Sequence, residues 1–149
     1  MEIVIGKTAG FCAGVNHAVK TAEENIKDEK IYCLGELTHN KQVMEKLEKS
    51  GLIVIEKLED IENNTEVIFR AHGMPKNAYD EAKKRNIKVY DFTCPRVLAL
   101  HEQIEKESKK GKYIFLLGEE GHPEIVGTMG FAKKNNLFLL QTINDVENA

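Results

Sequence analysis

The sequence alternates short apolar, β-branched runs with segments of helical periodicity, and this alternation limits the folds that the chain can adopt. Seven apolar runs recur, at residues 3–5, 31–34, 52–55, 67–69, 87–90, 113–117 and 137–140. Near-continuous apolar runs of this length are typical of strands buried on both faces, as in a parallel sheet. The alternation therefore predicts an α/β fold in which right-handed helical crossovers join the strands of parallel-sheet lobes.

Helical patterns fill most of the gaps between these runs. The spacing of apolar residues across positions 15–26 follows one face of a helix. A second helix is expected between Asn40, which suits an N-cap, and Gly51, which suits a stop. Three prolines suit the first position of further helices: Pro75, Pro95 and Pro123.

The distribution of strands predicts two units that meet near Cys94. Five expected strands precede this residue, two follow it, and only residues 141–149 remain after the last one. We therefore expect a first α/β lobe over residues 1–94 and the start of a second lobe over residues 95–149. Because two strands do not complete a lobe, we expect the protein to continue beyond Ala149.

Composition excludes several classes of protein. The 149 residues carry a net charge of −3, which argues against a generally basic nucleic-acid binder. No apolar run approaches the ~18 residues that a membrane helix needs. The first residues lack the basic lead and long apolar stretch of a signal peptide. Three widely spaced cysteines do not suggest a disulfide framework, so we expect a cytoplasmic protein. From the charge and the lack of a long apolar run, we expect no nucleic-acid or membrane partner.

The chain has three cysteines and five histidines, and five of these eight residues are predicted to lie in strand-to-helix elbows. They are Cys12, His39, His72, Cys94 and His122, and Glu124 shares the last elbow. Ligands of open parallel sheets bind at the carboxyl ends of the strands, so these elbows predict one site. Helix N-termini favour thiolates, the form of cysteine that binds soft metals and iron–sulfur clusters. Histidines at neighbouring elbows supply donors for a polyanionic ligand.

The other candidate residues have structural interpretations. Cys33 lies within an expected strand and is interpreted as a small buried hydrophobe. His101 shares a helix face with Val97 and Ile104, which indicates a core histidine whose ring nitrogens have hydrogen-bond partners. On local grounds alone, Glu124 is equally well explained as a carboxylate that interacts with a helix dipole.

Five short motifs, in order and at fitting spacings, resemble those of the 4-hydroxy-3-methylbut-2-enyl diphosphate reductases, the LytB family. They are GFCAGV at 10–15, THN at 38–40, AHG at 71–73, TCP at 93–95, and GHPE at 121–124 with GTMG at 127–130. Any one tripeptide is weak evidence, whereas five in series are specific. The resemblance spans nearly all of the 149 residues.

The resemblance implies a [4Fe–4S] cluster held by three cysteines, of which Cys12 and Cys94 match the first two. His39, His72 and His122 match the residues around the substrate diphosphate. Glu124 matches the catalytic acid that supplies protons to the allylic hydroxyl. The third cysteine ligand is expected beyond Ala149, because Cys33 maps to a strand.

The family's reaction removes the hydroxyl of an allylic diphosphate with two electrons and two protons. Its products are isopentenyl and dimethylallyl diphosphate, in the last step of non-mevalonate isoprenoid synthesis. The resemblance further implies three α/β lobes in a trefoil around the cluster, and an electron donor such as ferredoxin or flavodoxin. This chain matches the N-terminal half of such an oxidoreductase, so we expect it to be an inactive fragment by itself.

Two other functions fit the same elbows. A non-catalytic α/β module could bind phosphate there without metal, although the first elbow lacks the G-x-G-x-x-G and Walker patterns. A structural zinc site could use Cys12, Cys94 and a histidine, although the chain lacks the C-x-x-C pairs that mark most small zinc domains.

Overall fold

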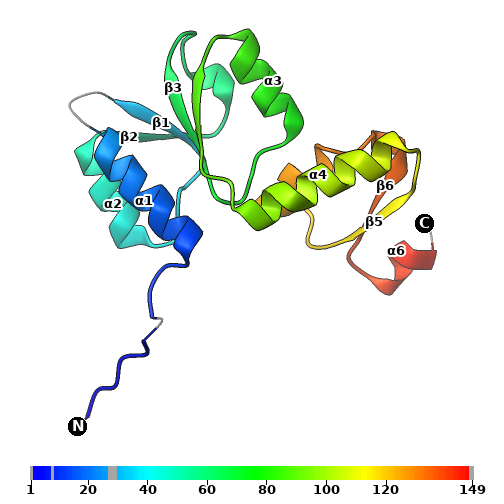
Figure 1. Cartoon of the computed structure of the whole chain (residues 1–149), viewed down its shortest axis with the longest axis horizontal. Helices are drawn as coiled ribbons and strands as arrows, with labels where there is room; N and C mark the ends of the chain where they lie inside the picture. Colours follow the sequence, from blue (N-terminus) through cyan, green and yellow to red (C-terminus); the bar gives the residue numbers. More distant parts are fainter. Residues whose placement is uncertain (1, 8, 27–29, 148–149) are drawn as a thin grey trace.

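The computed structural model describes residues 2–7, 9–26 and 30–147. Its main sheet has four strands in the order β2-β1-β3-β4, and every neighbouring pair is parallel. The strands are β1 (Ile31–Leu34), β2 (Leu52–Ile55), β3 (Glu66–Phe69) and β4 (Lys88–Asp91) (Figure 1). The expected α/β fold with parallel sheets is confirmed.

Two layers of helix cover this sheet, one on each face. Helices α1 (Ala13–Asn25) and α2 (Lys41–Ser50) bury Ala18, Ala22 and Leu47 against Cys33 and Ile68. The opposite face packs against η1 (Leu58–Asp60) and α3 (Lys76–Lys84). Successive strand residues point to opposite faces, so Cys33 and Leu34 enter different cores. Burial on both faces explains why β1 and β2 are apolar throughout, whereas the edge strand β4 has charged, exposed ends.

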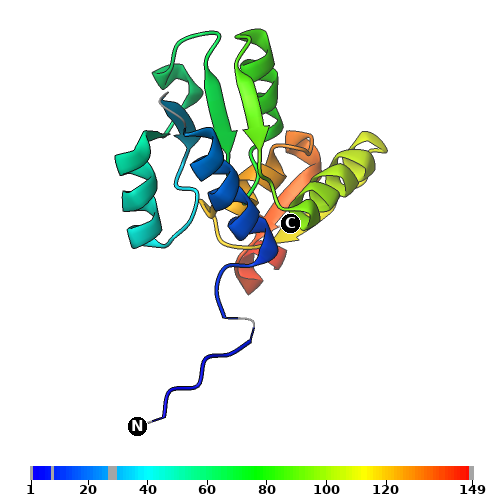
Figure 2. The same cartoon turned by 60° about the vertical axis from the view of Figure 1, so that its left-hand side comes forward.

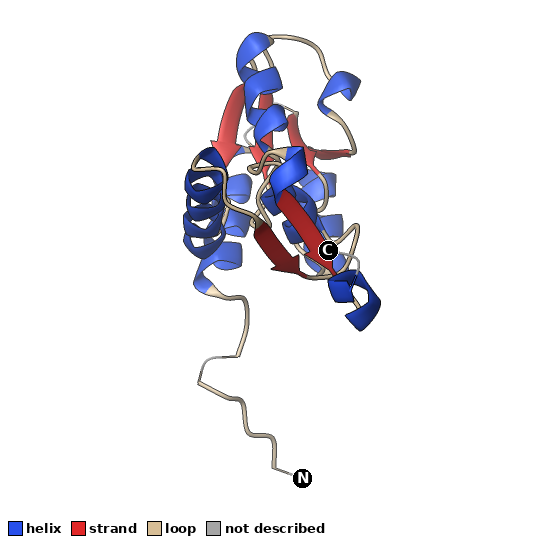
Figure 3. Ribbon diagram, turned by 90° about the vertical axis from the view of Figure 1, so that its right-hand side faces the viewer, coloured by secondary structure: helices blue, strands red, loops and turns tan. Residues whose placement is uncertain are grey.

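A second, smaller sheet follows the first. Helix α4 (Pro95–Lys109) leads from the main sheet to β5 (Ile114–Leu117), which pairs in parallel with β6 (Leu137–Leu140). Between these strands lie α5 (Pro123–Met129) and η2 (Lys134–Asn136), and α6 (Ile143–Glu147) follows β6. Figure 3 shows the two strands as a sheet separate from the other four. The lobe boundary at Cys94 stays a prediction.

Residues 3–5 differ from the expectation, because they are extended without belonging to a strand. Their side chains are 74%, 83% and 79% exposed, and the segment runs away from the body of the molecule (Figures 1 and 2). An apolar, β-branched pattern reflects burial in a sheet, so it does not make a strand without a neighbour to pair with. Here β1 already pairs on one side with β2 and on the other with β3.

The helices begin close to where the sequence places them. Pro95 and Pro123 open α4 and α5 as expected, whereas Pro75 is the N-cap of α3, one position before the helix. Asn40 caps α2 by accepting a hydrogen bond from the Val43 amide at 3.2 Å. Among the described residues, no helix has the length and apolar character required to span a bilayer.

The core of the main sheet depends on Phe69, which is fully buried at the end of β3 and packs edge-on against Tyr79. We expect Phe69→Ala to lower the free energy of unfolding by about 3–5 kcal/mol, because it leaves a cavity in a packed core. Phe115→Ala is the matched control, since Phe115 is 54% exposed on β5 and loses little burial. Urea denaturation measures both, and equal losses would contradict this assignment of the core.

Candidate functional site

The strand order of the main sheet reverses between β1 and β3. The chain passes from β1 outward to β2 and then returns to the other side of β1 to form β3. At such a switch point the two connections leave the carboxyl edge in opposite directions and open a crevice for ligands. His39 follows β1 and His72 follows β3, so both histidines flank this crevice.

Three histidine rings from different elbows meet there. The ring centroids of His39 and His72 are 5.3 Å apart, and those of His72 and His122 are 6.3 Å apart. His72 is half-buried in the middle, whereas His39 and His122 are exposed. Three elbows that are far apart in the sequence thus bring their imidazoles to one place.

Arg70 adds a positive charge to this place. It follows β3 directly, two residues before His72, and its guanidinium packs against Gly35, where a β-carbon would collide with it. Gly35 has a φ of +76°, so both space and backbone favour glycine. Burial, followed by the charge of Arg70, lowers the pKa of His72. His72 is therefore a neutral imidazole at neutral pH, and its buried Nδ1 lacks a hydrogen-bond partner in the described part of the chain.

The elbow after β5 presents His122 and Glu124 together. His122 is the N-cap of α5, and its Nδ1 accepts a hydrogen bond from the Glu124 amide at 3.3 Å. This bond fixes the tautomer, leaving Nε2 as the ring nitrogen that faces other partners. Glu124 lies in the first turn of α5, two residues after His122.

Cys94 is held at the carboxyl edge by a network of hydrogen bonds. Its amide donates to the carbonyl of Ala71 at 3.0 Å, which ties its elbow to that of His72. The preceding residue, Thr93, donates from its amide and its hydroxyl to Asp91 Oδ1. Tyr79 donates to Asp91 Oδ2 at 3.0 Å. Asp91 therefore fixes the turn that delivers Cys94 to the start of α4.

Cys12 is the exposed N-cap of α1, and its helix packs against the Cys94 elbow. The ring of His17, in α1, lies edge-on to Phe92 with centroids 5.8 Å apart. Figures 1 and 2 both show the first turn of α1 close to the first turn of α4. Two cysteines thus cap two neighbouring helices at the edge where the histidines lie.

Cys33 does not join them. It is fully buried within β1, and its thiol donates to the carbonyl of Gly35 at 3.1 Å. Burial raises the pKa of the Cys33 thiol to about 12, which disfavours the thiolate that a metal requires. The described residues contain no group of three cysteine, histidine or carboxylate side chains placed to hold a metal ion. The exposed thiol of Cys12 and the half-buried thiol of Cys94 fit as ligands of a cluster, but this donor set is incomplete.

Sequence reasoning missed Arg70, Asp91 and Tyr79. The Asp-x-Thr spacing at 91–93 is a turn signal that could have identified Asp91. Nothing local identifies Arg70, because its place beside Gly35 depends on the pairing of β1 with β3.

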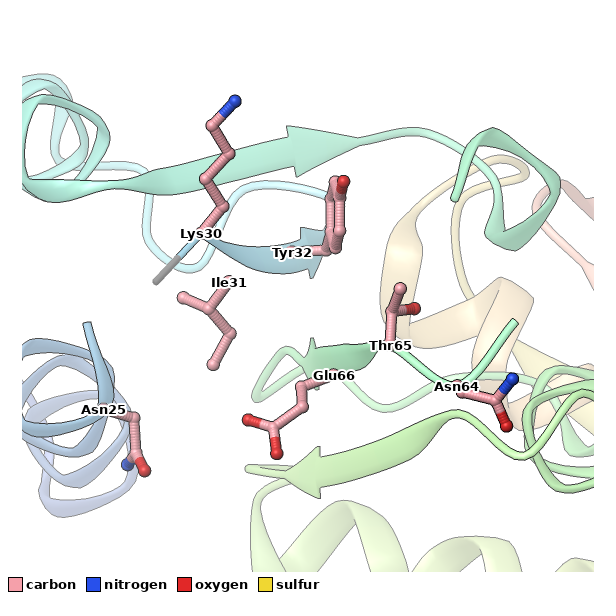
Figure 4. A pocket seen from close by; sticks show the side chains of 7 residues that line it. All are labelled: Asn25, Lys30, Ile31, Tyr32, Asn64, Thr65 and Glu66. Carbon is pink, nitrogen blue, oxygen red and sulfur yellow. The ribbon is translucent and has the colours of Figure 1, made fainter. Parts of the chain in front are cut away.

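A different hollow lies at the opposite edge of the sheet. Its volume is about 260 Å³, and its lining includes Ile31 and Glu66, the first residues of β1 and β3 (Figure 4). None of the residues singled out by the sequence reaches it.

The chain is similar to known proteins over almost its whole length. A family model described as LytB protein matches residues 3–149. The chain belongs to the LytB family. A relative from Haemophilus ducreyi is 39% identical over 99% of this chain, and one from Clostridioides difficile is also 39% identical over 99%. Both relatives are named 4-hydroxy-3-methylbut-2-enyl diphosphate reductase.

Solved structures show the same fold in longer LytB proteins. The E-1-hydroxy-2-methyl-but-2-enyl-4-diphosphate reductase of Plasmodium falciparum superposes with a TM-score of 0.89 and 34% identity, over 96% of this chain and 45% of its own. An (E)-4-hydroxy-3-methyl-but-2-enyl diphosphate reductase, described as the terminal enzyme of the non-mevalonate pathway, gives a TM-score of 0.81 and 36% identity. The chain spans about half the length of the curated relatives that it matches, 48% and 53% for the two named above.

The Asp91 network predicts how firmly Cys94 is held. Asp91→Ala removes the acceptor of three donors, and we expect it to cost about 1–3 kcal/mol of stability, as for hydrogen bonds to a charged group. Alkylation of Cys94 by iodoacetamide, followed by peptide mass spectrometry, should accelerate because the turn loosens. Asp80→Ala, an exposed change on α3, is the control that leaves both values unchanged. An unaltered alkylation rate in Asp91→Ala would show that the network does not position Cys94.

Proposed function

We propose that this chain supplies the N-terminal half of a 4-hydroxy-3-methylbut-2-enyl diphosphate reductase. The observation that carries the proposal is the convergence of three histidine rings beside two helix-capping thiols at one edge of the sheet. The relatives that carry the reductase name support it. The reaction takes two electrons and two protons, breaks the allylic C–O bond, and releases the hydroxyl as water.

His39, His72 and His122 form the part of the site that receives the substrate diphosphate. Imidazole N–H groups and the nearby Arg70 guanidinium supply the donors and the positive charge that such an anion needs. Bringing a diphosphate near His72 opposes the causes that lower its pKa, so binding is coupled to proton uptake. The crevice between β1 and β3 thus acts as an anion site in which Arg70 supplies a positive charge and His72 takes up a proton when the site is filled.

Glu124 acts as the general acid that delivers a proton to the leaving hydroxyl. It shares its elbow with His122, and the hydrogen bond between the two residues fixes their relative positions. The histidine that binds the diphosphate and the acid that protonates the hydroxyl are therefore positioned by the same elbow. A carboxyl group must lie within reach of the reacting oxygen, directly or through one intervening group. Anchoring the diphosphate beside this elbow supplies that proximity.

Cys12 and Cys94 hold a [4Fe–4S] cluster together with a ligand from outside the described residues. Both residues are N-caps of helices, and cubane clusters are held by cysteine thiolates. When bound, the cluster supplies the electrons and a Lewis-acidic iron for the hydroxyl oxygen. The chain provides two thiols at that edge, so it retains iron poorly without its partner half.

The remaining features of the whole protein follow from the same proposal. Residues 1–94 and 95–149 form the first lobe and the start of the second in a three-lobed trefoil. The substrate is a small allylic diphosphate, and the electrons come from a donor such as ferredoxin or flavodoxin. The protein works in the cytoplasm. The competing phosphate-binding module and zinc site use the same elbows but leave the protein colourless, whereas a cluster colours it brown.

The role of Glu124 is tested in the complete enzyme. Glu124→Gln keeps the shape of the side chain and removes its titrating proton. We expect turnover to fall by about 10² or more while substrate still binds, as for loss of a general acid. Glu120→Gln, in the same elbow, should leave turnover unchanged. Near-normal turnover of the Glu124→Gln variant would show that another residue delivers the proton.

The ligand assignment is tested by anaerobic reconstitution with iron and sulfide counts. The 149-residue chain should bind iron poorly, and extension through the next cysteine elbow should restore the brown cluster. In that longer protein, Cys12→Ser or Cys94→Ser should abolish the cluster. Cys33→Ser is the matched control and should leave the iron content unchanged. Loss of iron in Cys33→Ser as complete as in Cys12→Ser would overturn the assignment.

A further inference from the structure

His101 occupies an unusual position between the two units. It lies on α4, is 1% exposed, and stacks its ring on Phe131 with centroids 4.3 Å apart and an interplanar angle of 21°. Neither ring nitrogen has a hydrogen-bond partner among the described residues. A buried polar ring without partners is costly, so something other than hydrogen bonding explains its place.

The other edge of the ring meets the turn that carries His72. A β-carbon at Gly73 would lie 2.6 Å from Cε1 of His101, so the turn approaches the ring as closely as glycine permits. Gly73 has a φ of +77° and donates its amide to the carbonyl of Arg70 at 3.0 Å. The ring thus fills the space directly beneath the residue that follows His72.

Helix α5 closes the same turn from the other side. A β-carbon at Gly127 would lie 3.0 Å from the carbonyl oxygen of Gly73, and one at Gly130 would collide with Pro75. Gly73 is therefore clamped between His101 of α4 and Gly127 of α5. Helix α5 begins directly after His122, so this clamp joins the elbow of His72 to that of His122.

The surroundings of His101 favour an uncharged ring. Burial lowers its pKa, and the more distant carboxylates of Asp91 and Glu124 only partly oppose this. A groove of about 300 Å³ between α3 and α4 reaches the ring and carries the other charged and titratable groups near it. These are Lys76, Tyr79, Asp80 and Glu102.

We propose that His101 is a positioning residue: its ring sets the separation of His72 and His122 by holding the Gly73 turn against α5. The inference rests on the proposed function only in naming those two histidines as a diphosphate site. It adds a residue that touches neither substrate nor cluster and acts through the turn that it supports.

The test compares His101→Ala, which removes the ring, with His101→Phe, which keeps a ring able to stack on Phe131. In the 149-residue chain, imidazole NMR follows the ring-to-ring NOE of His72 and His122 and the pKa of His72. We expect His101→Ala to lose the NOE and to let the His72 pKa rise toward its ordinary value, because the turn is no longer buried. His101→Phe should keep both. If the Ala variant does not fold, His101→Leu replaces it, since it fills volume without a ring to stack.

A second readout is the dependence of stability on pH. A histidine whose folded pKa is lowered stabilises the fold above its unfolded pKa, about 6.5, and this stabilisation is lost as the pH falls below that value. The wild-type chain and His101→Phe both retain His72, so the difference between their pH profiles isolates His101. We expect the Phe variant to lose less stability between pH 7 and 5.

The matched control is Ile104→Ala, a buried change on the same helix that faces β5 rather than the Gly73 turn. It should lower stability while leaving the NOE and the His72 pKa intact. In the complete enzyme, His101→Ala should lower kcat/KM by about 10², the effect of a small misplacement, and Ile104→Ala should not. An unchanged NOE and His72 pKa in His101→Ala, or their equal loss in Ile104→Ala, would overturn the proposal. The NMR readouts decide this even if the complete protein is not a reductase.

Discussion

The parallel pairing of β1 with both β2 and β3 is the constraint on which the rest of the structure depends. It fills both sides of β1 and, together with the parallel pairing of β3 and β4, sends the strand-to-helix elbows of the main sheet to the same edge. It also creates the reversal in strand order that opens a crevice at that edge. His39, His72, the guanidinium of Arg70 and the Cys94 elbow gather there because of this topology, before any attraction between them is considered. His122 joins them from the elbow after β5, which belongs to the second sheet.

Much of this organisation could be predicted from the sequence, because its physical causes are local. The apolar runs of β1, β2 and β3 report burial on both faces, and caps such as Asn40 mark helix starts. Once the strands are parallel, His39 and His72 must leave the same edge. The apolar run at residues 3–5 carries the same signal yet lacks a pairing neighbour, and a pattern within one segment cannot report whether that neighbour exists.

The parts that could not be predicted depend on contacts between distant segments. Arg70 packs against Gly35 because two strands 35 residues apart are neighbours, which only the strand order reveals. Helical spacing correctly placed His101 on the buried face of α4. It could not show that Phe131 covers one side of the ring and Gly73 lies at its edge. Helix periodicity predicts which face of a helix is buried. Which residues cover that face depends on the tertiary structure.

The exposed N-terminal segment has a consequence for the chemistry of Cys12. Residues 6–11 separate it from this thiol, so Ile5 and Cys12 are seven positions apart and lie at most about 25 Å from each other when the chain is fully extended. Any sheet edge that takes up residues 3–5 as an added strand therefore tethers Cys12 within that radius. The position of the Cys12 thiol is then restrained from both sides, by the first turn of α1 and by the docked strand.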